Sequence, residues 1–378
     1  MMNYKIPLFK IYWEDDDIDS VIKVIKRGNY WTVGPEIKTL EDNIAKYIGK
    51  KYAVTFNSGT SALYADLLAH NINSGEVIVP SFTFISSANS ILLAGAKPIF
   101  AEIEDESFGL NSEDVKEKIT RKTKAIMVVH YGGFPCKDIK AIKEIANDHN
   151  LVLIEDAAES FGSKIDNKKI GTFGSSSMFS FCQNKIITSG EGGIILTDLK
   201  DIFEKLKLIR SHGRVENSEG YFNTTKELDY IQIGYNFRMS SISAALANSQ
   251  FKKFAKIAKL RRKKAKYYNK NLSKNYKIKT PKEQKNWYSI YQMYTIQLEN
   301  KKTRDALQRN LKENNVLTKV YFNPIHLTKY YREKFNYKNL DLPTTENISN
   351  RVLTLPIYPN ISKKELDYII KLIINFIR

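Results

Sequence analysis

Short apolar runs alternate with helical patterns between residues 52 and 197. The runs show little polar alternation, as expected for strands whose two faces are both covered by helices. They predict an α/β fold with a mainly parallel sheet flanked by helices. The expected strands are Tyr52–Phe56, Val77–Pro80, Pro98–Ala101, Ala125–Val129, Leu151–Glu155, Ser177–Phe181 and Gly193–Thr197.

Helices are expected between these strands and on both sides of them. A long basic helix over residues 240–272 leads into a unit of mixed strands and helices. The chain has 378 residues, which suits a large domain followed by a smaller one. We therefore predict a large α/β domain with a helical lead-in over residues 1–250 and a small α+β domain over residues 251–378. The other expected helices are 14–26, 36–47, 61–69, 86–94, 112–119, 138–148 and 363–377.

The composition is that of a globular protein, with 42% hydrophobic and 26% charged residues. The net charge of +18 would suit a polyanionic partner. However, much of the excess is lysine scattered along helices, which indicates a solvated surface, and we expect no nucleic-acid partner. Cys136 and Cys182 lack ligand-like spacing, so we expect neither a disulfide nor a metal site. The two unpaired cysteines fit a reducing cytoplasm, and the lack of a signal core and of a membrane-length apolar run predicts a soluble protein.

Candidate chemistry gathers where loops follow the expected strands, which is where α/β sheets bind ligands. The segment Asn57–Ala62 follows a strand and opens a helix, so it would suit a phosphate or be an ordinary N-cap. Asp156 ends a buried strand, where it would face a cation or cap a helix. Lys185 lies on a turn between a strand and the glycines of Gly190–Gly193, a position suited to imine chemistry. Together these residues make the chain a candidate pyridoxal 5'-phosphate (PLP) enzyme.

Further side chains are candidates on weaker grounds. Ser180 would donate to the phosphate, and Phe84 or Phe82 would stack on a planar ring. Candidate substrate contacts, each of which has a structural alternative, are Trp31, His212, Tyr321 and His326.

Taken together, the motifs resemble the DegT/DnrJ/EryC1/StrS family of PLP-dependent nucleotide-sugar aminotransferases, which have the aspartate aminotransferase (type I) fold. The similarity runs nearly end to end, and the motifs are specific in this order and spacing. They are Gly34–Pro35, Asn57–Ser61, Pro80–Phe84, Glu155–Ala158, Phe179–Phe181, Lys185 with Gly190–Gly193, Gly234–Met239 and Leu355–Tyr358.

The resemblance implies a role for each candidate. Lys185 is the Schiff-base lysine, Asp156 partners the pyridine nitrogen and Phe84 stacks on the ring. Glu159 stands where the family usually has Gln, as in perosamine-synthase-like members. Gly59, Thr60, Ser61 and Ser180 hold the phosphate, and Asn236 reaches across from the second subunit of a homodimer.

The resemblance also implies a reaction. Glu159, Asn184 before Lys185, and Gly234–Met239 are similar to GDP-perosamine or viosamine synthases, which aminate C4 of 4-keto-6-deoxy sugars. The expected partners are L-glutamate and a nucleotide-linked keto sugar (GDP, dTDP or UDP), and the product would serve polysaccharide biosynthesis, for example of an O-antigen. The alternatives are a C3 aminotransferase, a PLP-dependent sugar dehydratase, or a non-catalytic sugar- or nucleic-acid-binding protein on the same fold. A related dehydratase branch has His in place of the lysine, so Lys185 argues against that branch.

Overall fold

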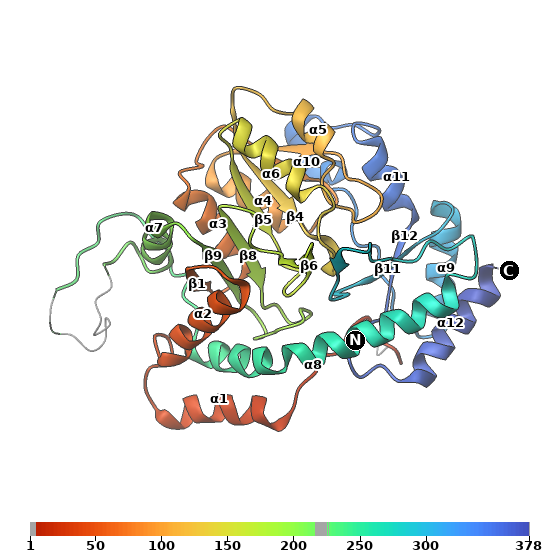
Figure 1. Cartoon of the computed structure of the whole chain (residues 1–378), viewed down its shortest axis with the longest axis horizontal. Coiled ribbons are helices and arrows are strands. Elements are labelled where there is room, and N and C mark those ends of the chain that lie inside the picture. Colours follow the sequence, from red (N-terminus) through yellow and green to blue (C-terminus); the bar gives the residue numbers. More distant parts are fainter. Residues whose placement is uncertain (1–4, 216–224, 226, 378) are drawn as a thin grey trace.

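The computed structural model describes residues 5–215, 225 and 227–377. Within them, a central sheet has the strand order β1-β9-β8-β5-β4-β2-β3 (Figure 1). Only β9 runs antiparallel to its neighbours, so the predicted mainly parallel sheet is confirmed. The strands of this sheet are β1 (Tyr52–Phe56), β2 (Glu76–Pro80), β3 (Lys97–Ala101), β4 (Thr123–Val129), β5 (Val152–Asp156), β8 (Ser176–Ser180) and β9 (Gly193–Thr197).

Helices surround this sheet and form much of the C-terminal part (Figure 1). Those of the first part of the chain are α1 (Asp15–Arg27), α2 (Pro35–Ile48), α3 (Gly59–Ala69), α4 (Ser86–Ala94), α5 (Ser112–Glu117), α6 (Ile139–Asp148) and α7 (Lys200–Arg210). They are followed by α8 (Ser241–Leu272), α9 (Lys301–Glu313), α10 (Lys329–Phe335), α11 (Pro343–Arg351) and α12 (Lys363–Ile377). Each expected helix is present with small shifts at its ends, whereas α7 and α9 to α11 had no individual prediction.

The two faces of the central sheet bury separate sets of side chains. Along β5, Leu153 packs with residues of α2, α6 and α8, whereas Ile154 packs with residues of α3, α4 and α7. Because successive strand residues point to opposite faces, Glu155 belongs to the first side and Asp156 to the second. Apolar packing on both faces explains why the strand sequences show little polar alternation.

The carboxyl ends of the parallel strands meet at one edge of the sheet. Ser180 at the end of β8 pairs with Gly193 at the start of β9, and Phe56 at the end of β1 pairs with the same glycine from the other side. A Cβ on Gly193 would lie 2.7 Å from the carbonyl oxygen of Ser58. Glycine is therefore needed here for the start of β9 to approach the turn that opens α3.

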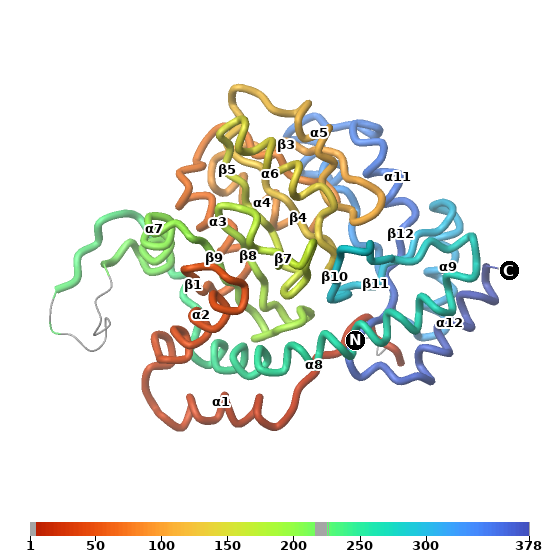
Figure 2. Tube along the Cα trace, in the orientation of Figure 1, coloured from red at the N-terminus to blue at the C-terminus, as the bar shows by residue number. Residues whose placement is uncertain are grey.

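The C-terminal part adds a β-pair and helices next to this sheet. Strands β11 (Tyr294–Gln297) and β12 (Val352–Leu355) pair antiparallel, and β10 (Trp287–Tyr288) pairs with β6 (Lys164–Ile165), which in turn pairs with β7 (Lys168–Lys169). Figure 2 shows α8 running from the first part of the chain into the second, with α1 alongside it. The domain boundary predicted at residue 250 lies inside α8 and stays a prediction.

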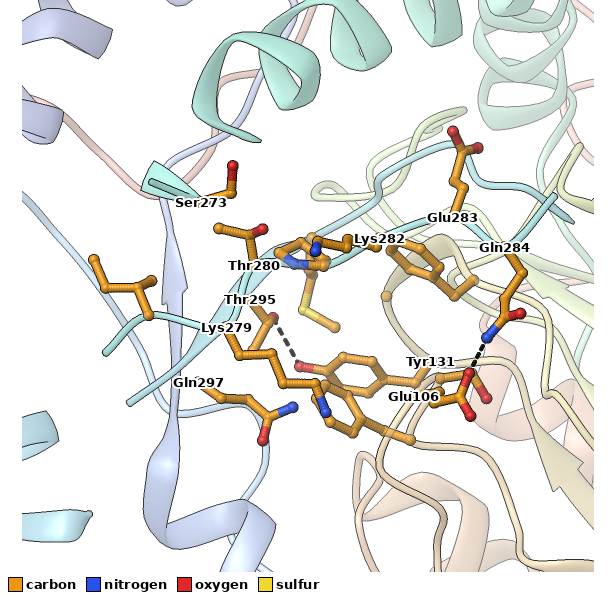
Figure 3. Close-up of a pocket in the computed structure, with 17 residues that line it drawn as sticks. Glu106, Tyr131, Ser273, Lys279, Thr280, Lys282, Glu283, Gln284, Thr295 and Gln297 are labelled. Carbon is orange, nitrogen blue, oxygen red and sulfur yellow. Dashed lines mark hydrogen bonds between the residues drawn. The ribbon is translucent and has the colours of Figure 1, made fainter. Parts of the chain in front are cut away.

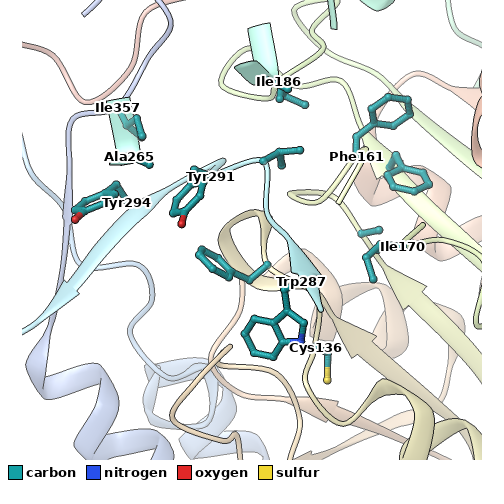
Figure 4. Packing of buried hydrophobic residues seen from close by; sticks show 14 of the residues in the cluster. Cys136, Phe161, Ile170, Ile186, Ala265, Trp287, Tyr291, Tyr294 and Ile357 are labelled. Atoms are coloured by element: carbon teal, nitrogen blue, oxygen red, sulfur yellow. The ribbon is translucent and has the colours of Figure 1, made fainter. Parts of the chain in front are cut away.

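One hydrophobic cluster joins the two parts of the chain. Phe161 and Ile170 come from the segment after β5, whereas Trp287, Tyr291 and Tyr294 come from the C-terminal part, and Figure 4 shows them close to one another. This shared core fixes the C-terminal segments against the sheet edge that carries the candidate residues. None of the helices in the described residues is both long enough and apolar enough to span a membrane.

Candidate active site

A cavity of about 390 Å³ lies at the carboxyl edge of the sheet. It brings together eight of the residues singled out from the sequence, which come from segments spread along most of the chain. These residues are Gly59, Thr60, Phe84, Asp156, Glu159, Ser180, Lys185 and Tyr321. The expectation that these side chains share one place depended on strand order, and the observed topology supplies that order.

Lys185 lies in the loop between β8 and β9 and projects into this cavity. Its Nζ is 3.4 Å from Oε1 of Glu159, and both side chains are largely buried. Oε2 of Glu159 accepts a hydrogen bond of 2.9 Å from the backbone N–H of Gly132. Glu159 is thus held from one side and orients the lysine amine from the other.

Asp156 is a buried carboxylate at the end of β5. Its Oδ2 accepts a hydrogen bond of 2.7 Å from Oγ of Ser87, and its Oδ1 accepts one of 3.2 Å from the N–H of Ala158. Burial raises the pKa of Asp156, although these two hydrogen bonds and the charge of Lys185 act to lower it. A cationic donor in the cavity would therefore stabilise the ionised carboxylate.

The opening of α3 has the features of an anion site. Ser58 caps the helix by accepting from the N–H of Ser61, while the N–H groups of Gly59 and Thr60, in the first turn, have no acceptor within the helix. A Cβ on Gly59 would lie 3.3 Å from Sδ of Met178 and 3.5 Å from Oγ of Ser180, so this turn packs closely against β8 and a larger residue would require Met178 to shift. Helix N–H groups with the hydroxyls of Thr60 and Ser180 form a suitable cradle for a phosphate.

These features fit the cofactor that the motifs imply. The cavity offers a primary amine, a buried carboxylate that lacks a cationic partner at hydrogen-bond distance among the described residues, and an anion site at a helix N-terminus. Phe84 lines the same cavity with 59% of its surface exposed, which is unusual for a phenylalanine and suits stacking on a planar ring. An amine, a carboxylate, a flat apolar face and an anion cradle match the four parts of PLP.

Ser61 and Asn236 do not line this cavity in the single chain. The Ser61 hydroxyl donates to Oδ1 of Asn57 at 2.5 Å, and the exposed Asn236 accepts at its backbone oxygen from the side chain of Asn57. Asn236 was expected to act on a second subunit, so both assignments stay predictions.

Three of the four candidate substrate contacts also lie outside the cavity. His326 is fully buried, and its ring nitrogens contact Oγ of Ser81 at 2.7 Å and Oε1 of Glu346 at 3.2 Å. Trp31 donates from Nε1 to the backbone oxygen of Val24 at 3.1 Å. His212 is exposed beside Arg238 and Arg214, and partial burial followed by these two charges lowers its pKa. Their substrate roles stay predictions, and His326 has both nitrogens occupied by structural partners.

Sequence reasoning missed several residues of the cavity. Ser87 is the second residue of α4, three residues after Phe84, and this closeness in sequence was the signal that could have found it. Lys319 and Phe322 flank Tyr321 and enter from the C-terminal part, and Lys319 Nζ lies 4.7 Å from the centre of the Tyr321 ring. Phe9 reaches the cavity from the N-terminal segment, without any local pattern that would indicate it.

Comparison with known proteins agrees with this arrangement. The model of the DegT/DnrJ/EryC1/StrS aminotransferase family matches residues 12–374. A GDP-perosamine synthase of Escherichia coli O157:H7 is 36% identical over 93% of this chain and 92% of its own length. A GDP-perosamine synthase of Vibrio cholerae is 33% identical over 98% of this chain and 99% of its own length. The solved structure of Helicobacter pylori PseC, an aminotransferase of pseudaminic acid biosynthesis, is similar with a TM-score of 0.90 and 27% identity, covering 99% of this chain and 98% of that chain.

Proposed function

The chain belongs to the DegT/DnrJ/EryC1/StrS aminotransferase family, and we propose that it transfers an amino group from L-glutamate to C4 of a nucleotide-linked 4-keto-6-deoxyhexose. The protein is a PLP-dependent sugar aminotransferase. One observation carries the proposal: Lys185, Asp156 and the opening of α3 line a single cavity. The product is then a 4-amino-4,6-dideoxy sugar nucleotide for polysaccharide biosynthesis.

When bound, PLP supplies an electron sink for a carbanion at the carbon that loses or gains nitrogen. Asp156, kept in place by Ser87, would hold the proton of the pyridine nitrogen and so favour that role. The opening of α3 and Ser180 would hold the phosphate, and Phe84 would stack on the ring. These residues would orient the cofactor for reaction with the lysine.

Lys185 is the residue that moves protons in the proposed mechanism. Its amine lies beside Glu159, which orients Nζ within the largely buried cavity. From this position the amine would act as a general base that takes a proton from the substrate carbon bearing the nitrogen. It would then act as a general acid that returns the proton to the carbon derived from the cofactor's aldehyde. An amine that serves as both base and acid suits a two-stage reaction, in which glutamate leaves as 2-oxoglutarate before the sugar is aminated.

Two facts support a 4-keto sugar as the acceptor. Relatives more than 30% identical along nearly their whole length are described as GDP-perosamine synthases, from Escherichia coli, Vibrio cholerae and Caulobacter vibrioides. The segment Gly234–Met239 resembles the corresponding segment of family members that aminate C4. GDP, dTDP and UDP are the candidate nucleotides, and the following assay distinguishes them.

The test is a panel of GDP-, dTDP- and UDP-linked 4-keto-6-deoxy sugars assayed with glutamate and the holoenzyme. We expect 2-oxoglutarate to form with one nucleotide series and NMR to place the new nitrogen at C4. Nitrogen at C3, or loss of oxygen at C3, would contradict the assignment and favour a C3 aminotransferase or a dehydratase.

A matched pair of variants tests the catalytic lysine. Lys185→Ala should abolish turnover and the visible absorbance that borohydride bleaches in the holoenzyme. Lys200→Ala changes an exposed lysine at the start of α7 and should leave both unchanged. Turnover that survives in Lys185→Ala would overturn the catalytic role of Lys185. A parent protein that shows neither turnover nor this absorbance after PLP is supplied would favour a non-catalytic binding protein.

The proposal includes a homodimer whose active sites use Asn236 of the second subunit. Size-exclusion chromatography with light scattering should give twice the mass of the chain. Mixing inactive Lys185→Ala with Asn236→Ala subunits should restore activity, because one site of each hybrid then has both residues. A monomer, or mixtures that stay inactive, would contradict shared sites.

A further inference from the structure

A second cavity of about 420 Å³ lies where the C-terminal part meets the loops after β3 and β4 (Figure 3). Its apolar wall includes the rings of Phe108, Tyr131 and Phe134 and the side chains of Ile278 and Met293. It shares no lining residue with the cavity that contains Lys185. The second cavity is therefore a separate space, and the function proposed above assigns nothing to it.

Two polar atoms of its lining are buried without a partner among the described residues. They are Oγ1 of Thr280 and Oε1 of Gln297, on residues that are 3% and 5% exposed. Figure 3 shows both side chains among those that surround the cavity. Buried polar atoms without hydrogen bonds cost free energy, and in a cavity of this size they indicate a ligand with complementary groups.

The charges around the second cavity are mostly neutralised within the protein. Lys279 pairs with Asp105 at 2.5 Å, Glu106 pairs with Lys137 at 2.5 Å, and Glu283 pairs with Arg262. Lys282 differs, because it is exposed and takes part in none of the ion pairs of the described residues. The site thus offers one unneutralised cation beside an aromatic chamber.

We propose that this cavity binds a nucleoside monophosphate. Three aromatic rings and a methionine suit a flat heterocyclic base better than a small aliphatic ligand. The amide of Gln297 and the hydroxyl of Thr280 provide the donor and acceptor groups that read the edge of a base. Lys282, on the loop at the mouth, suits the phosphate.

One residue, Tyr131, lies between the second cavity and the active site. The Tyr131 hydroxyl donates a hydrogen bond of 2.6 Å to the backbone oxygen of Tyr321, which lines the cavity of Lys185. Tyr131 also packs against Phe82, at a ring distance of 5.3 Å, in the loop that carries Phe84. Tyr131 therefore links the lining of the second cavity to residues that line the cavity of Lys185.

Isothermal titration calorimetry of the holoenzyme tests the site with GMP, AMP, UMP and dTMP, and with the matching nucleosides. We expect at least one monophosphate to bind, and Thr280→Val and Gln297→Leu each to weaken its binding at least tenfold. Thr318→Val is the matched control, because Thr318 also has a buried hydroxyl without a partner but lines neither cavity. Lys282→Ala should weaken the monophosphate but not the nucleoside, whereas Lys285→Ala, on an exposed neighbour outside the lining, should change neither.

Thermal unfolding adds a readout that separates binding from structural roles. Thr280→Val and Gln297→Leu remove buried groups without partners, so the ligand-free variants should unfold at the same temperature as the parent or higher. Binding that is unchanged in both variants would place the nucleotide in the active site and overturn the proposal. No heat with any nucleotide would overturn the proposal, and equal affinities for a monophosphate and its nucleoside would overturn the role of Lys282 in binding the phosphate.

Discussion

Glu155 and Asp156 are neighbours on strand β5, but their carboxylates point to opposite sides of the sheet and have different hydrogen-bond partners. Glu155 accepts hydrogen bonds from the backbone N–H groups of Gly171, Phe173 and Gly174 at 2.6 to 2.8 Å and from Nε2 of His130 at 3.1 Å. Among the described residues, Asp156 accepts two, from Ser87 and Ala158, on the other side of the strand. Both carboxylates are buried, and that of Asp156 faces the cavity that contains Lys185.

The electrostatics follow from this difference in partners. Burial acts to raise the pKa of both groups, but at Glu155 the His130 contact and the backbone donors outweigh it, and the pKa is lowered. At Asp156 the partners do not compensate for burial, and the pKa is raised. Glu155, whose oxygens accept four hydrogen bonds, fastens the loop at 171–174 to the sheet. Asp156, which accepts two, can bind a further donor from a ligand in the cavity.

The largest expected effect comes from removing the charge on the cavity side. Asp156→Asn keeps the shape but cannot hold a protonated ring nitrogen. We expect turnover to fall about a thousandfold, or about 4 kcal/mol, in the range for truncating one partner of a buried charge pair. Steady-state kinetics with saturating cofactor measure this loss.

Asp66 provides the matched control for this substitution. It is also fully buried with a pKa that burial raises, but it bonds to Ser176 and does not line the cavity. Asp66→Asn should therefore leave turnover within a fewfold of the parent. Equal losses in both variants would mean that Asp156 acts on the fold and not on the cofactor.

A smaller effect, and one of a different kind, is expected on the opposite side of the strand. Glu155→Gln places an amide group where every neighbouring partner is a donor, so N–H groups of the 171–174 loop lose their acceptor. The free energy of unfolding should fall by about 3 kcal/mol, as for a broken buried ion pair. Urea denaturation measures it, and turnover per folded molecule should change much less than in Asp156→Asn.

Sequence patterns identified most of the fold and, of the two carboxylates compared above, the role of Asp156. The strands were predicted because both sheet faces are apolar, which produces short β-branched runs between turns, and Asp156 stood out as a charge at the end of such a run. The opening of α3 was found because a glycine and hydroxyls follow a strand directly. These features are local, so each of them is visible within a few residues.

The rest depends on contacts between distant segments. Glu155 was part of a recognised motif, but its partners come from a loop 16 to 19 residues later and from His130 on the neighbouring strand's end. Lys319 enters the cavity only because the shared core places the C-terminal part against the sheet. The second cavity is lined by residues 106–108, 131–134 and 273–297, and none of these segments has a motif.

The pH dependence of stability should have opposite signs for the two carboxylates in the cofactor-free protein. Glu155 has a lowered pKa, so its contribution is present above its ordinary pKa and is lost as the pH falls through the folded value. Asp156 has a raised pKa, so its contribution is present at low pH and is lost as the pH rises through the folded value.

Denaturation of both variants between about pH 2 and pH 8 checks these signs. Relative to the parent, Glu155→Gln should be less stable at neutral pH and approach the parent in acid. Asp156→Asn should be more stable at neutral pH and also approach the parent in acid. Parallel curves at all pH values would show that neither carboxylate titrates as the contacts indicate.

The smallest effect concerns Ser87, whose hydroxyl is one of the two donors to Asp156. Ser87→Ala should lower cofactor affinity about fivefold, since one buried hydrogen bond contributes about 1 kcal/mol. The lost donor also raises the pKa of Asp156, so the acid limb of the activity profile should move to higher pH. Ser87→Thr keeps a hydroxyl and should restore the profile.

Ser90→Ala separates this effect from a general change in α4. Ser90 is equally buried one turn later, but its hydroxyl donates to the backbone oxygen of Ser87 at 3.0 Å and does not touch Asp156. Its removal should lower stability without moving the acid limb. A shift of equal size in both serine variants would contradict a direct role for the Ser87 hydroxyl. The hydroxyl would then have no specific effect on the pKa of Asp156, which burial raises.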